Sequence, residues 1–162
     1  MTENNEGASK VLGIIQDARI AMVTHVDGEG RLVAKPMATQ ETEFDGTLRF
    51  IARRSSAQIQ GLLQRPAVNV AYSGSGAWVS LAGTARIVED VAKLQELWST
   101  FTSSWLEGGP EDPDNVLIEI DADTAEYWGG PGGSKVTQIA QLISAKLGGD
   151  KRPAGRNEVV DL

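Results

Sequence analysis

Four consecutive residues, Arg53, Arg54, Ser55 and Ser56, carry the side chains of this sequence best suited to binding an anion. They follow the strand-like run 47–52 and precede residues 57–64, whose apolar spacing predicts a short helix. Two guanidinium groups, two hydroxyl groups and the free N–H groups of a first helical turn together match the hydrogen-bonding needs of a phosphate monoester. The segment is therefore a candidate phosphate site, with a solvated arginine pair and a plain Ser56 N-cap as the alternative interpretation.

The charge balance and the residue types limit the partners. The 162 residues include 22 acidic and 15 basic side chains, which give a net charge of −7. A surface of that sign repels nucleic acid and anionic membranes. The sequence contains no cysteine and only one histidine, His25, so we expect neither thiol chemistry nor a metal site. The polar start and the lack of a long apolar run predict a cytoplasmic protein.

Runs of apolar and β-branched residues predict six strands, most of them separated by turn sequences. Turns at 27–30 and at Asp45-Gly46 lead us to expect that the first three strands form a meander of hairpins. Gly83 interrupts the longest run and indicates a bulge, a barrel corner or close backbone approach. The predicted strands are residues 19–26, 31–40, 47–52, 68–72, 78–88 and 116–120.

Helical spacing predicts four helices, and Ser56 and Asp90 are the N-caps of the middle two. Closely spaced strands joined mainly by turns favour a mainly β protein, an antiparallel barrel decorated by helices, over a parallel doubly wound sheet. We expect one domain over residues 1–149, followed by a charged tail over residues 150–162. The predicted helices are residues 9–17, 57–64, 90–101 and 134–147.

Several motifs carry a resemblance to a known family. The run 30–37, the Asp45-Gly46 turn and the run 50–52 with Ser56 four positions on resemble the pyridoxamine 5′-phosphate oxidase-like superfamily of FMN-binding split barrels. A second set resembles its general stress protein 26 branch more narrowly. That set comprises Asp90, Leu97-Trp98, residues 108–113, Ala125-Glu126-Tyr127-Trp128 and residues 158–162.

The resemblance implies a six-stranded antiparallel split β-barrel that forms a homodimer and holds FMN at the subunit interface. In this family an arginine usually stands at position 35 and often a lysine at position 58, where this chain has Lys35 and Gln58. Phosphate binding would then depend on Arg53 or Arg54 turning inward. The implied flavin contacts are Lys35, Met37, Thr39, Gln40, Ile51, Ala52, Arg54, Ser56 and Gln58, with Trp78 and Trp105 able to reach the flavin across the dimer.

The function that the resemblance implies is an FMN-binding general stress protein, with the flavin supplying any redox chemistry and FAD or the deazaflavin F420 as other cofactors. The residues assign no general base. The acidic residues Glu111, Asp112 and Asp114 are typical of turns and solvated loops. Lys151-Arg152-Pro153 is a poor substitute for the substrate-phosphate residues of pyridoxamine 5′-phosphate oxidase, so that activity is not predicted. A non-catalytic flavin carrier or sensor and an F420-dependent reductase are the alternatives.

Overall fold

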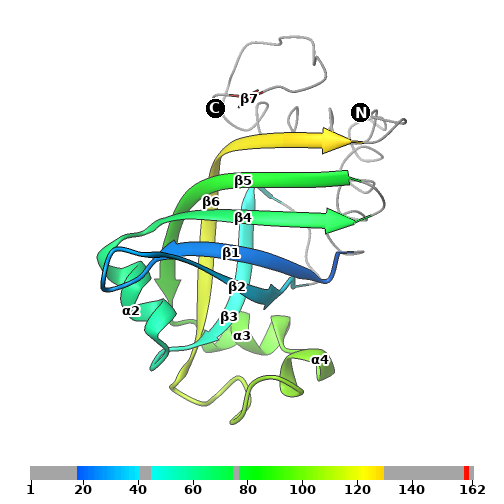
Figure 1. Cartoon of the computed structure of the whole chain (residues 1–162). Coiled ribbons are helices and arrows are strands. Elements are labelled where there is room, and N and C mark those ends of the chain that lie inside the picture. Colours follow the sequence, from blue (N-terminus) through cyan, green and yellow to red (C-terminus); the bar gives the residue numbers. More distant parts are fainter. Residues whose placement is uncertain (1–17, 41–44, 75–76, 130–158, 161–162) are drawn as a thin grey trace.

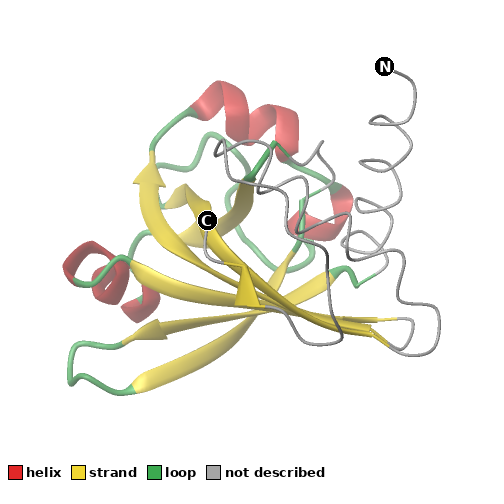
Figure 2. Cartoon of the chain, turned by 90° about the horizontal axis from the view of Figure 1, so that it is seen from above, coloured by secondary structure: helices red, strands yellow, loops and turns green. Residues whose placement is uncertain are grey.

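The computed structural model of the chain describes residues 18–40, 45–74, 77–129 and 159–160. Figure 1 shows one antiparallel sheet flanked by short helices, with strand order β2-β1-β4-β5-β6-β3 and with β7 paired to β6. Seen from above in Figure 2, the sheet curls strongly. The elements are β1 Ile20–Val26, β2 Leu32–Ala38, β3 Thr47–Arg53, α2 Ala57–Gln64, β4 Ala67–Gly74, β5 Ala77–Val88, α3 Val91–Leu97, α4 Thr100–Ser103, β6 Asn115–Gly129 and β7 Val159–Val160.

The predicted mainly β, antiparallel architecture is confirmed. Side chains alternate along the strands, and the inner face of the curled sheet holds the main core, which includes Val23, Phe50, Leu81 and Ile118. The predicted helices over residues 9–17 and 134–147 lie outside the described residues. None of the helices in the described part of the chain has the length and apolar character that crossing a membrane requires.

The predicted meander is wrong at its third strand. β1 and β2 form the expected hairpin, but β3 pairs with β6, with Phe50 opposite Ile118. A turn sequence specifies that the chain reverses and not which strand becomes the neighbour. β3 buries side chains on both faces, since Phe50 enters the main core while Ile51 packs with Leu94 and Leu117 under α3. Pairing with β6 supplies cover for both faces.

The glycine prediction in the longest strand is confirmed. The register between β5 and β6 shifts at Ala82 and Gly83, which marks a β-bulge. A Cβ atom on Gly83 would collide with the backbone carbonyl of Asp121 on β6. The strand predicted over residues 116–120 is correspondingly too short, because β6 continues past the bulge as one strand to Gly129. The bulge therefore forms the corner at which two long strands bend together.

The helices follow their capping residues. Ser56 caps α2 as predicted, and its side chain accepts a hydrogen bond from the N–H of Ile59. The helix predicted over residues 90–101 is instead two helices, because Trp98 is extended and Ser99 begins α4 by accepting from the N–H of Thr102. Trp98 packs partly buried against the second core. A serine after the first two turns was thus the sequence signal for the break.

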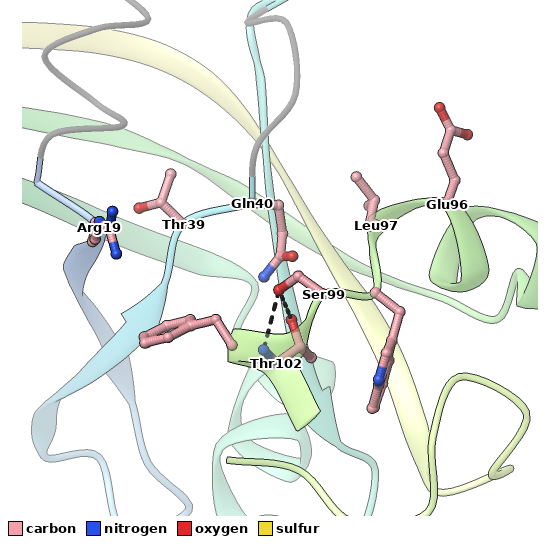
Figure 3. Close-up of a pocket in the computed structure, with 9 residues that line it drawn as sticks. Arg19, Thr39, Gln40, Glu96, Leu97, Ser99 and Thr102 are labelled. Atoms are coloured by element: carbon pink, nitrogen blue, oxygen red, sulfur yellow. Dashed lines mark hydrogen bonds between the residues drawn. The ribbon is translucent and has the colours of Figure 1, made fainter. Parts of the chain in front are cut away.

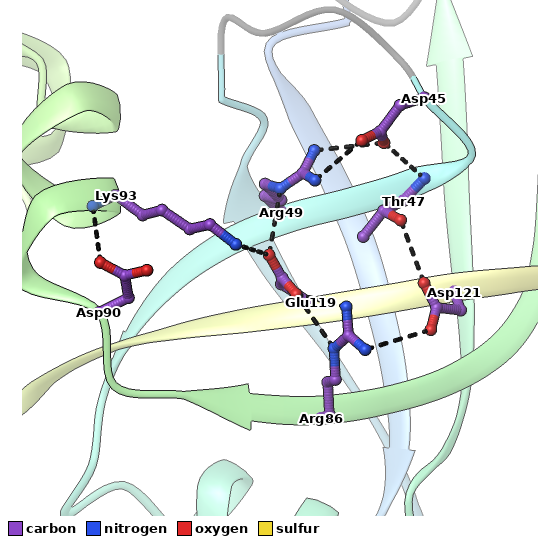
Figure 4. Close-up of polar contacts among 8 residues, drawn as sticks. All are labelled: Asp45, Thr47, Arg49, Arg86, Asp90, Lys93, Glu119 and Asp121. Atoms are coloured by element: carbon purple, nitrogen blue, oxygen red, sulfur yellow. Dashed lines mark hydrogen bonds and ion pairs between the residues drawn. The ribbon is translucent and has the colours of Figure 1, made fainter.

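A buried carboxylate joins four elements around this second core (Figure 4). Glu119 on β6 is 2% exposed and accepts hydrogen bonds from Arg49 Nε on β3 at 3.3 Å, Arg86 Nη2 on β5 at 2.6 Å and Lys93 Nζ on α3 at 3.2 Å. Arg49 also pairs with Asp45 at 2.9 Å. Burial alone raises the pKa of Glu119, but the three cations outweigh it and hold that pKa below its ordinary value of 4.5.

We expect Glu119→Gln to lower the free energy of unfolding by about 3 kcal/mol. That is the lower end of the range for breaking a buried ion pair, because Arg86 and Lys93 keep contact with water. Urea unfolding at neutral pH measures the loss. The matched control is Glu29→Gln, which removes an exposed pair with Arg31 and should cost at most about 1 kcal/mol.

The pH dependence of the same variant gives a second readout. A carboxylate whose pKa is lowered by folding stabilises the fold above its unfolded pKa and loses that contribution as pH falls through the folded pKa. The difference between the wild type and Glu119→Gln should therefore be full above pH 4.5 and shrink in more acidic buffer. A difference that stays constant down to acid unfolding would contradict the ionic role of Glu119.

Candidate functional site

The described sheet ends in two edge strands. β2 and β3 stand at the two ends of the strand order, so each has ladder partners on one side only among the described residues. Half of the backbone N–H and C=O groups of such an edge strand point away from its neighbour and are available to a ligand. On β2, Lys35 pairs with Val23 and Met37 with Ala21, so both side chains lie on the inner face of the sheet.

The inner face of β2 meets the start of α2. Gln58 is 3% exposed, and its amide Nε2 lies 3.2 Å from the sulfur of Met37. Ser56 begins the same helix. Three of the predicted flavin contacts are therefore assembled at one point, and Lys35 lies two residues along β2 on the same face. Gln58 occupies a buried position, where the family's lysine would bring a charge.

Lys35 is a positively charged side chain on the inner face of β2. None of the acidic side chains in the described segments forms an ion pair with it. The neighbouring His25 is 2% exposed, and its Nδ1 has no hydrogen-bond partner among the described residues. Burial, and then the charge of Lys35, lower the pKa of His25, while Asp27 opposes the shift. A neutral His25 leaves Lys35 as the positive charge beside β2.

The arginine pair of the predicted phosphate segment is occupied by the protein's own acidic loop. Arg53 Nε lies 2.7 Å from Asp114, and its Nη1 lies 3.3 Å from Asp112 and donates to the carbonyl of Glu107 at 2.9 Å. Asp114 also accepts from the backbone N–H and the hydroxyl of Ser55, both at 2.8 Å. These hydrogen bonds and the charge of Arg53 lower the pKa of Asp114.

Arg54 is held less firmly than Arg53. It pairs with Glu89 and donates from Nε to the carbonyl of Pro113 at 3.2 Å, and both members of the ion pair are well exposed. Interpreting Asp112 and Asp114 as turn and solvation residues was incomplete. Asp112 does accept the turn bond from the N–H of Asp114, but both carboxylates also anchor the loop to the end of β3.

The remaining predicted contacts are scattered. The side chains of Ile51 and Ala52 are buried in the two separate cores, so only their backbone could touch a ligand. Trp78 is 53% exposed and pairs directly with Trp128 on the outer face, away from Lys35. Trp105 is 71% exposed and stacks edge-on against Phe101, with ring centroids 6.1 Å apart. Trp78 can therefore approach the inner face of β2 only from another subunit.

A pocket of about 290 Å³ lies where β2 ends, and Figure 3 shows its lining. Two predicted contacts, Thr39 and Gln40, form part of its wall. The hydroxyls of Thr39 and Tyr72 are both buried, and they contact each other without forming a hydrogen bond of good geometry. Burial raises the pKa of Tyr72 well above its ordinary value, so Tyr72 is neutral. The other lining residues are Arg19, Glu96, Leu97, Trp98, Ser99, Phe101 and Thr102.

Sequence reasoning missed most of this pocket. Arg19 precedes the first strand and adopts a left-handed backbone with φ of 44°, which no residue pattern announced. The predicted helix over residues 90–101 would hold Trp98 and Phe101 in one continuous helix, whereas the break before α4 brings them to the pocket at the end of β2. Recognising Ser99 as an N-cap would have been the available signal.

Comparisons with known proteins identify relatives of this chain. A family model described as pyridoxamine 5′-phosphate oxidase like matches residues 6–153. The structure resembles general stress protein 26 from Bacillus anthracis, with 28% identity, a TM-score of 0.65, and coverage of 74% of this chain and 92% of that one. It also resembles the general stress FMN/FAD binding protein of Xanthomonas citri, with 29% identity, a TM-score of 0.65, and coverage of 80% and 92%.

A curated relative adds a further match. Protein bli-3 of Neurospora crassa is 30% identical over 121 residues, which are 67% of this chain and 58% of that protein. The chain thus spans little more than half the length of this relative. Because the family model covers nearly all of the sequence and the fold agrees with solved structures of the group, the chain belongs to the pyridoxamine 5′-phosphate oxidase like family.

Proposed function

We propose that this protein binds FMN along the inner face of β2, as a flavoprotein of the general stress type. The observation that carries the proposal is the edge strand with Lys35, which has no acidic partner among the described residues and lies two positions before Met37, the residue that contacts Gln58 of α2. The related Xanthomonas citri protein, described as FMN/FAD binding, supports a flavin as the ligand. When bound, the flavin supplies the redox chemistry by accepting a hydride or electrons.

The residues of β2 and α2 fit the parts of this cofactor. Lys35 provides the charge for the phosphate, together with Ser56 and Gln58 at the start of α2. Met37, Thr39 and Gln40 line the ring. Ile51 and Ala52 contribute backbone only.

Arg54 is the second cation available to the phosphate. Its ion pair with Glu89 is exposed and therefore weak, so Arg54 can exchange Glu89 for a phosphate at little cost. Arg53 is more firmly held, because it would have to leave two carboxylates and a carbonyl.

A homodimer belongs to this proposal. The outer face of the sheet carries exposed apolar side chains from β1, β2, β5 and β6, and a second copy of the chain would bury them. A contact through this outer face would bury Trp78 on the side of the sheet away from Lys35, so it does not by itself bring Trp78 or Trp105 to the flavin. The exposed residues of this face are Ile20, Met22, Leu32, Trp78 and Trp128.

Two activities fit the same site. An oxidoreductase needs an electron donor and often an acid or base. Of the described side chains that face inward beside Lys35 on β2, His25 and Tyr72 could transfer a proton, and both are buried. This observation favours a flavin carrier or sensor over rapid catalysis. FAD and F420 stay open as cofactors, and a cytoplasmic location stays a prediction from the sequence.

FMN binding is tested by fluorescence titration of the flavin-free protein. We expect saturable quenching at micromolar protein, and we expect Lys35→Ala to weaken FMN about ten- to a hundredfold through loss of a charged contact. Riboflavin lacks the phosphate, so its affinity should not change in Lys35→Ala. Lys35→Arg should keep FMN binding, and Arg31→Ala, at the exposed turn before β2, is the matched control.

Two results would count against this site. If FMN, FAD and F420 all fail to saturate the protein, the flavin proposal fails as a whole. If FMN binds but Lys35→Ala weakens riboflavin as much as FMN, Lys35 supports the fold of β2 and does not contact the phosphate.

The dimer is tested by sedimentation. The wild type should sediment as one species of twice the 17.3 kDa chain. Met22→Glu places a charge in the exposed apolar face and should shift the protein to monomer, because an unpaired charge in an apolar contact costs several kcal/mol. Leu63→Glu, on the exposed side of α2, is the control and should stay dimeric. A folded wild-type monomer that binds flavin stoichiometrically would overturn the interface site.

Carrier and enzyme are separated by stopped-flow reduction of the bound flavin. With NADH or NADPH we expect reduction no faster than that of free FMN, and pyridoxamine 5′-phosphate oxidation that is weak or absent. A site built for catalysis accelerates its reaction by at least about a millionfold. Fast, saturable reduction followed by reoxidation with a defined acceptor would establish an oxidoreductase and refute the carrier.

A further inference from the structure

The pocket at the end of β2 has a chemistry of its own. We infer that it binds a small planar aromatic monocarboxylate, with the carboxylate on Arg19 and the ring between the apolar residues of α3 and α4. The inference goes beyond flavin binding, because only Thr39 and Gln40 are shared with the proposed cofactor contacts. Figure 3 shows Arg19, Thr39 and Gln40 on one side of the pocket and Leu97 on the other.

Arg19 supports the inference through its backbone. It is the non-glycine residue with positive φ in the described part of the chain, at 44°, and it is fixed there because its carbonyl accepts from the N–H of Thr39 at 2.9 Å. A side chain in this left-handed region is disfavoured relative to glycine, because its Cβ atom approaches the following carbonyl oxygen. Strained residues of this kind are typical of ligand sites, where the side chain is what the position requires. At Arg19 that side chain is a planar guanidinium, which matches a carboxylate through two parallel hydrogen bonds.

The hydroxyl of Thr39 supplies a second polar contact. It is buried, and the Tyr72 hydroxyl beside it satisfies it only weakly, so it can still form a hydrogen bond with a ligand oxygen. Gln40, 7% exposed, donates from Nε2 to the carbonyl of Ala38 at 3.2 Å and brings its amide to the same wall. A ligand oxygen placed between Arg19 and Thr39 would satisfy both groups.

The residues on the opposite wall indicate the shape of the rest of the ligand. Leu97, Trp98 and Phe101 are apolar, and aromatic walls favour a flat ring. The volume of about 290 Å³ lies at the small end of the usual range for ligand sites, which fits one ring with a short substituent. Glu96 also borders the pocket, and its carboxylate extends away from Gln40 and Ser99 in Figure 3. Among the described lining residues Arg19 is the one guanidinium, and a single guanidinium pairs with one carboxylate, which favours a monoanion over a phosphate dianion.

The test uses benzoate as the probe and the full-length, flavin-free protein. Titration followed by amide resonances in a ¹H–¹⁵N spectrum should give a dissociation constant on the order of 1 mM or tighter, with the largest shifts at residues 19, 39, 40 and 97–102. Benzamide, which lacks the charge, and cyclohexanecarboxylate, which lacks the flat ring, should each bind more weakly.

Variants separate the guanidinium from the fold. Arg19→Gln should weaken benzoate about tenfold or more, and Arg31→Gln, an exposed arginine at the β1–β2 turn, should leave it unchanged. Arg19→Gly relieves the left-handed backbone, so it should lose benzoate while its thermal midpoint does not fall. A lowered midpoint together with normal benzoate binding would assign Arg19 a structural role and overturn the inference.

The same titration with saturating FMN distinguishes this pocket from the flavin site. Benzoate binding that persists with FMN bound supports a separate site. Displacement of benzoate by FMN would make the pocket part of the flavin site and refute a separate one, while leaving FMN binding intact. No binding of benzoate would refute the inference whether or not FMN binds.

Discussion

The pairing of β3 with β6 is the constraint on which the rest of the architecture depends. Because β3 leaves the hairpin of β1 and β2, the sheet begins at β2 and ends at β3, and both strands keep a free edge among the described residues. β3 can leave because β6 covers it along its whole length, from Thr47 opposite Asp121 to Arg53 opposite Asn115. Had β3 closed on β2, the backbone of β2 would be consumed by ladder hydrogen bonds, and a ligand could reach only side chains.

Contacts outside the main core also stabilise the pairing of β3 with β6. Glu119 draws β3, β5, β6 and α3 together through three cations, and the bulge at Gly83 bends β5 and β6 at the corner. α3 in turn carries Leu94 into the second core beneath it and leads directly into α4. The wall of the pocket is therefore a consequence of the same contacts that hold β3 in place. Stability and site geometry are coupled here through packing and not through a shared side chain.

Local chemistry could be predicted from the sequence, and long-range pairing could not. Ser56 and Asp90 cap the helices that follow them, and Gly83 forms a bulge in its own strand. Because these effects are local, the residue types alone predict them. The partner of β3 depends on which surface can cover Ile51, and that surface is built by residues more than 40 positions later. Most of the family's flavin positions were named from motif resemblance, and the structure brings Met37, Ser56 and Gln58 together. Arg19 was not predicted as a site residue. Its positive φ goes with a contact made in the folded chain, between its carbonyl and the N–H of Thr39, and its residue type does not indicate it.

The arginine segment shows why residue type alone overstates a site. In an acidic chain, a cluster of cations is surrounded by carboxylates of the same molecule, and these reach it at an effective concentration that a free phosphate seldom matches. Arg53 is held by Asp112 and Asp114 because the loop before β6 must close onto the end of β3, so its charge serves the fold. Lys35 stands on an edge strand among buried neutral groups, and no such loop covers it among the described residues. The position of a cation relative to the acidic loops, more than the number of cations, therefore decides which charge is left for a ligand.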